Sequence, residues 1–74
     1  MNIFKARKEK IFLKRKREER ERLRNDIENL EKEIMRTEST FNLTTDEYLL
    51  ESAIYERKAQ SAKMNYLIRL AKEI

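Results

Sequence analysis

The 74-residue sequence predicts an all-α fold, an antiparallel two-helix hairpin of coiled-coil type, and three observations support that prediction. First, the chain contains no Gly and no Pro, the residues that most often interrupt a helix. Second, 43% of the residues are charged and 39% are hydrophobic, a composition typical of long helices. Third, the one stretch rich in Ser, Thr and Asn, residues 37–44, separates two helix-forming segments and predicts the connection of a single helical module.

The first helix is expected over residues 5–36, which are rich in the good helix formers Lys, Arg, Glu and Leu. Apolar residues recur at spacings of four, three and four on one face: Leu23, Ile27, Leu30 and Ile34. Toward the N-terminus this face meets Arg20 and Lys16, so we expect packing to stop near Leu23 and the basic part before it to fray. That part would be held by pairs each worth about 0.2–0.5 kcal/mol: Lys14–Glu18, Arg17–Glu21 and Glu18–Arg22.

The second helix is expected over residues 45–73. Residues 44–47, Thr-Thr-Asp-Glu, fit a capping box in which Thr44 is the N-cap and Glu47 is the N3 residue. A capping box marks the start of a helix and therefore favours a hairpin with residues 37–44 as its connection. The alternative is one long helical rod, because neither Gly nor Pro interrupts this stretch.

One face of the second helix is broad and apolar when its residues are placed at about 100° intervals. It contains Leu50, Ala53, Ile54, Ser61, Met64, Ile68 and Ala71. Arg57 and Gln60 interrupt it near the middle. Packing this face on the first helix predicts the hairpin core: Leu23, Ile27, Leu30, Ile34, Leu50, Ile54, Met64 and Ile68.

A second face, roughly opposite, contains all three tyrosines with small residues between them; we call it the Tyr/Ala face: Tyr48, Ser52, Tyr55, Ala59, Ala62 and Tyr66. The first helix can cover only one face of the second. A second apolar face therefore predicts another chain, most simply in a homodimer that completes the core with four helices, or else a different protein partner. The alternative is a solvated face, since Tyr is tolerated on surfaces and Ala is simply a good helix former.

The positive charge of the chain lies in its N-terminal third. Residues 1–24 contain eleven Lys or Arg and four Glu, a net charge of +7, whereas residues 25–74 have a net charge of −3. Nucleic acid is a possible partner, with phosphate contacts expected from seven residues: Lys14, Arg15, Lys16, Arg17, Arg20, Arg22 and Arg24. The alternatives are an acidic protein and a solvated helix that binds nothing; an anionic membrane is a poorer match, because the apolar residues of this segment form no clean stripe.

Several classes of function are excluded or disfavoured by the residues that are missing. The chain has no His and no Cys, so the commonest acid–base, nucleophilic and metal-binding sites cannot be built. Without Gly it has no phosphate-binding loop. We therefore expect no enzyme activity, no cofactor, no metal and no small-molecule substrate. The longest apolar run is three residues, too short for a membrane span or a secretory signal, which predicts a cytoplasmic protein.

The C-terminal half resembles the YaaL-like family of small proteins of Gram-positive bacteria. The similarity covers about residues 43–73 and rests on a run with small residues, then an aromatic residue and Leu-Ile: Tyr48-Leu49-Leu50-Glu51-Ser52-Ala53-Ile54-Tyr55-Glu56-Arg57-Lys58-Ala59, Ala62, Tyr66-Leu67-Ile68 and Ala71-Lys72. The resemblance implies a cytosolic helical protein and brings no known activity, cofactor or catalytic residue. The function expected from the sequence is that of a non-enzymatic interaction module that self-associates or binds a protein through its second helix. The alternative is a non-specific nucleic-acid-binding accessory protein that uses its basic helix.

Overall fold

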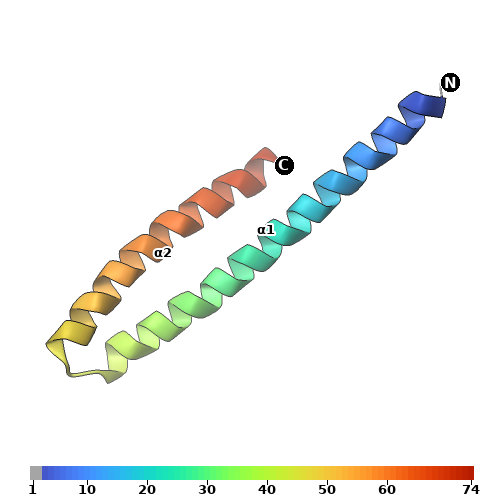
Figure 1. Cartoon of the computed structure of the whole chain (residues 1–74). Helices are drawn as coiled ribbons and strands as arrows, with labels where there is room; N and C mark the ends of the chain where they lie inside the picture. Colours follow the sequence, from blue (N-terminus) through green and yellow to red (C-terminus); the bar gives the residue numbers. More distant parts are fainter. Residues whose placement is uncertain (1–2) are drawn as a thin grey trace.

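The computed structural model describes residues 3–74 and contains two α-helices, α1 (Ile3–Leu43) and α2 (Glu47–Glu73). They run in opposite directions side by side (Figure 1), which confirms the all-α helical hairpin. The molecule measures 67 × 15 × 13 Å, and its length is set by α1, since 41 residues at about 1.5 Å each span about 60 Å.

Helix α1 continues seven residues beyond the end expected from the sequence. Thr37 does not break the helix, because its Oγ1 donates a hydrogen bond to the Glu33 carbonyl oxygen one turn earlier, at 3.0 Å. Its side chain is 4% exposed and faces α2, so tertiary packing outweighs the weak helix propensity of this stretch. The connection is therefore residues 44–46 rather than 37–44.

The N-cap of α2 is Asp46, not Thr44. Its Oδ1 accepts hydrogen bonds from the backbone N–H groups of Tyr48, at 2.9 Å, and Leu49, at 3.1 Å. Thr44 instead accepts a bond from the Asp46 N–H through Oγ1, at 3.2 Å, inside the turn. Asp is the better N-cap because its charged carboxylate makes stronger hydrogen bonds to backbone N–H groups than a hydroxyl does. The helix consequently begins at Glu47, two residues later than expected.

The core is a single seam between the helices, and buried positions recur every seven residues on each: Leu23, Leu30 and Thr37 on α1, with Ala53, Gln60 and Leu67 on α2. Partly buried apolar side chains pack around the cluster of Leu23, Leu30 and Leu67: Ile27, Ile34, Met64, Leu70 and Ile74. Alternating spacings of three and four thus keep one face of each helix toward the other.

Two residues expected in this core lie at its edge. Ile54 is 46% exposed and Ile68 is 41% exposed, whereas Gln60 is 6% exposed and Leu67 is 5% exposed. Consecutive residues of a helix point about 100° apart. The seam on α2 runs through Ala53, Gln60 and Leu67, at intervals of seven residues. Ile54 and Ile68 directly follow Ala53 and Leu67, so their side chains point to one side of the seam.

A buried polar contact lies in the middle of the seam. Gln60 Nε2 donates a hydrogen bond to Thr37 Oγ1 at 2.8 Å. Gln60 Oε1 is buried and has no hydrogen-bond partner among the residues that the structure describes. A buried amide opposite a buried hydroxyl has one favourable pairing, so this contact fixes how far α2 can slide along α1.

Candidate interaction surfaces

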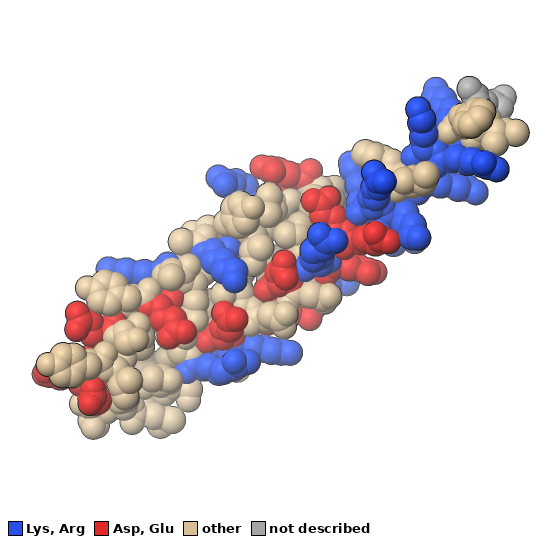
Figure 2. Space-filling view, in the orientation of Figure 1, with Lys and Arg blue, Asp and Glu red and all other residues tan. Residues whose placement is uncertain are grey.

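The N-terminal part of α1 extends past the end of α2. Arg20 Nη2 donates a hydrogen bond to the Ile74 carbonyl oxygen at 3.0 Å, which places the end of α2 beside Arg20. We call residues 3–19 the overhang; Figure 1 shows it as the blue end of α1, with no part of α2 alongside. Figure 2 shows Lys and Arg gathered over this end, whereas charges of both signs alternate over the rest of the molecule.

The structure divides the seven residues expected to contact nucleic acid into two groups. Those in the overhang are Lys14, Arg15, Lys16 and Arg17. Arg20 lies level with the end of α2, where it donates to Ile74, and Arg22 and Arg24 lie on the part of α1 that has α2 alongside. Lys16 Nζ lies 4.7 Å from the centroid of the Phe12 ring, a cation–π contact that holds its charge close to the helix.

The expected charge pairs of this segment are not formed. Within residues 3–74 the one ion pair joins Arg57 Nη2 to Glu38 Oε1, at 3.2 Å. The Lys and Arg side chains of the overhang therefore have no carboxylate within 4 Å among the described residues. No described carboxylate therefore neutralises their charge.

The Tyr/Ala face lies on the side of α2 away from the seam, and all six of its residues are exposed. Tyr48 is 82% exposed, Tyr55 is 62% exposed and Tyr66 is 51% exposed. Lys58 Nζ lies 5.9 Å from the centroid of the Tyr55 ring and covers part of it. The structure thus leaves a row of three aromatic rings, with small residues between them, open to solvent.

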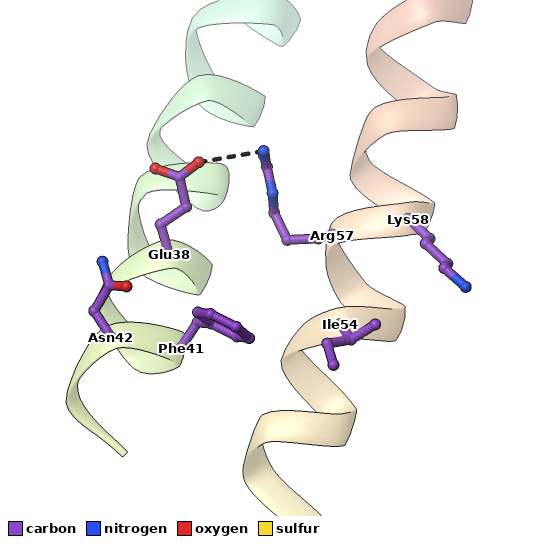
Figure 3. Close-up of a pocket in the computed structure, with 6 residues that line it drawn as sticks. All are labelled: Glu38, Phe41, Asn42, Ile54, Arg57 and Lys58. Atoms are coloured by element: carbon purple, nitrogen blue, oxygen red, sulfur yellow. Dashed lines mark ion pairs between the residues drawn. The ribbon is translucent and has the colours of Figure 1, made fainter. Parts of the chain in front are cut away.

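A groove near the turn is formed by side chains of both helices (Figure 3). It is lined by Glu38, Phe41, Asn42, Ile54, Arg57 and Lys58. Phe41 and Ile54, each 46% exposed, supply its apolar surface, and the Arg57–Glu38 ion pair bridges the two helices above them. Because the charged side chains of this pair are 40% and 53% exposed, it stabilises the hairpin by only about 0–1 kcal/mol.

The seam contact between Thr37 and Gln60 was not anticipated from the sequence. The sequence marks Gln60 only as an interruption of the apolar face, and Thr37 only as the start of the connection. The available signal was spacing, because Thr37 lies seven residues after Leu30 and Gln60 lies seven residues before Leu67. Polar residues at such positions are typical of seams whose register is specified.

The described residues hold no cluster of three or more Asp or Glu side chains arranged to bind a metal ion. Within residues 3–74, neither helix contains a stretch long and apolar enough to span a lipid bilayer.

The chain was compared with models of known protein families. The family model described as "Protein of unknown function (DUF2508)" matches residues 3–74, which includes both helices and the overhang. No curated protein and no solved structure matches the chain. Because the match covers nearly the whole sequence, the chain belongs to the DUF2508 family.

Proposed function

We propose that the protein is a non-enzymatic helical module that forms a homodimer through the Tyr/Ala face of α2. The observation that supports this most strongly is the exposure of all three tyrosines on one side of one helix. Tyr buries a large ring at low entropic cost and keeps its hydroxyl at the wet edge of a contact, which explains its enrichment at protein interfaces. Ala59 and Ala62 leave room for a second helix to approach closely.

The accessible surface of the chain supports a second copy. It is 6795 Å², whereas a compact monomer of 9.1 kDa exposes about 4,900 Å². The excess of roughly 1,900 Å² exceeds the ~800 Å² that each partner buries in a standard interface. Only four hydrophobic residues are buried among those described: Leu23, Leu30, Ala53 and Leu67. Two helices with so small a core gain much of their stability when another pair covers them.

Sedimentation equilibrium at micromolar concentration tests the dimer. The expected mass is twice the 9.1 kDa of the chain. Tyr55→Glu combined with Ala59→Glu should weaken dimerisation by on the order of 100-fold or more, because four carboxylates would be desolvated in one symmetric contact.

The matched control adds the same charge elsewhere, through Ser39→Glu on α1 and Asn65→Glu beside the Tyr/Ala face. Its mass should equal that of the unmodified chain. A clean monomer at these concentrations rules out the homodimer. A dimer that survives Tyr55→Glu and Ala59→Glu removes this face from the contact. Capture of a different protein by this face, with the chain itself monomeric, would replace the second copy with a heterologous partner.

The overhang supports a second candidate function, non-specific nucleic-acid binding, because its Lys and Arg side chains have no acidic partner among residues 3–74.

We also propose, on the resemblance of residues 43–73 to the YaaL-like family, that the protein is of Gram-positive bacterial origin and cytoplasmic. A fractionation of cells that produce the protein tests the location.

A further inference from the structure

We propose that the overhang, residues 3–19, binds double-stranded DNA by lying in the major groove with phosphates on both sides of it. This inference rests on the second candidate function and specifies the ligand and the mode of contact. The structural basis is that α2 covers one face of α1 from about Arg20 to the turn. Before that point no face of the helix is covered by α2 (Figure 1).

The charges of the overhang surround the helix. It contains eight Lys or Arg residues and three Glu. Two rows, each of residues seven positions apart, lie about 160° from one another around the axis, at ~100° per residue: Lys8 with Arg15, and Lys10 with Arg17. All four side chains are exposed, and none forms an ion pair with a described residue. A helix with cations on opposite sides is suited to two walls of negative charge rather than to one flat surface.

The dimensions of the overhang match a groove of duplex DNA. The major groove of B-form DNA is about 12 Å wide and admits an α-helix, while the major groove of A-form RNA is too narrow and deep. Seventeen residues span about 25 Å, so the overhang can follow the groove over several base pairs before α2 begins.

Other polyanions fit these observations less well. Single strands are bound mainly by stacking on open aromatic rings, but the Lys16 ammonium group lies over one face of Phe12. A membrane surface requires one apolar stripe. The consecutive apolar residues Ile11, Phe12 and Leu13 are each more than half exposed and spread over about 200° of the helix.

Fluorescence anisotropy with the full chain tests the proposal, using a labelled 30-base-pair DNA duplex, the matching RNA duplex and the DNA single strand between 20 and 200 mM salt. We expect the DNA duplex to bind at least tenfold more tightly than the other two at low salt. Lys8→Gln with Arg15→Gln, and separately Lys10→Gln with Arg17→Gln, should each reduce the log–log salt slope by about 2, since each phosphate contact contributes about 0.9. The matched control on the hairpin, Lys32→Gln with Arg36→Gln, should leave the slope within about 0.5 of the original.

Each remaining outcome overturns a defined part of the proposal. If only one of the two rows alters the slope, the helix lies on one side of the nucleic acid and not in a groove. If the single strand or the RNA duplex binds as tightly as the DNA duplex, the duplex-DNA inference is wrong while the second candidate function stands. If the control reduces the slope as much as either row, the overhang is not the contact. If none of the three nucleic acids binds at 20 mM salt, both the major-groove proposal and the second candidate function are wrong.

Discussion

Leu30→Ala is expected to lower the free energy of unfolding by about 2–5 kcal/mol. Leu30 is 2% exposed and is the one large side chain among the described residues that is fully buried. It belongs to the cluster of Leu23 and Leu67, so its truncation leaves a cavity at the centre of the only seam between the helices. Urea denaturation followed by circular dichroism measures the change, with all variants compared at one protein concentration because association alters apparent stability.

Met35→Ala is the matched control for this prediction. Met35 lies on the same helix, five residues later, and is 69% exposed. Its truncation should change the free energy of unfolding by less than about 0.5 kcal/mol. Equal losses for the two variants would show that Leu30 does not anchor the seam.

Thr37→Val alone is expected to lower the free energy of unfolding by about 1–3 kcal/mol. The variant removes the oxygen that accepts the hydrogen bond from Gln60 Nε2, and the amide cannot reach water because Gln60 is 6% exposed. Both polar atoms of the Gln60 amide would then be buried without a partner among the described residues, since Oε1 already has none.

Combining Thr37→Val with Gln60→Leu should restore the stability lost by Thr37→Val or exceed the original value, because the buried amide is removed together with its partner. The coupling between the two positions, obtained from all four proteins in a denaturation cycle, isolates their interaction. If the two effects simply add, Thr37 and Gln60 do not interact in solution. We also expect the double variant to sample alternative registers, measured as broader amide signals in NMR spectra, because the polar pair that aligns the helices is gone.

The two helices and their approximate packing faces could be predicted from the sequence, because composition and apolar spacing determine them. Leu23, Ile27, Leu30 and Ile34 have the regular spacing of a seam, and all four lie in it. The boundaries of the helices could be predicted less well from the sequence. Thr37 was expected to break α1 on intrinsic propensity, yet its hydroxyl bonds to Glu33 and its side chain faces α2. That balance depends on a contact with Gln60, 23 residues away, which no local rule contains.

The two candidate surfaces could be predicted from the sequence to different degrees. The Tyr/Ala face could be predicted from periodicity alone. Residues spaced three or four positions apart lie on the same side of a helix, whatever packs against its other side. The overhang could not be predicted in this way, because its extent depends on where α2 ends relative to Arg20. The edge positions of Ile54 and Ile68 also required the structure, since hydrophobicity favours burial at both while the seam geometry excludes them.

The homodimer through the Tyr/Ala face is tested most directly by comparing two label-to-label distances between the two copies. The chain has no Cys, so Glu56→Cys beside this face and Ser39→Cys on α1 each provide a single site for a nitroxide label. Both sites are exposed. They lie near the same level of the hairpin, where Arg57 pairs with Glu38.

In the proposed dimer the two copies of α2 meet and the two copies of α1 lie outside them. Pulsed EPR should therefore give a Glu56→Cys pair distance shorter than the Ser39→Cys pair distance by on the order of 15–20 Å, about two spacings between packed helices. An equal or shorter distance for Ser39→Cys, or no dipolar coupling at either site at micromolar concentration, would contradict the account.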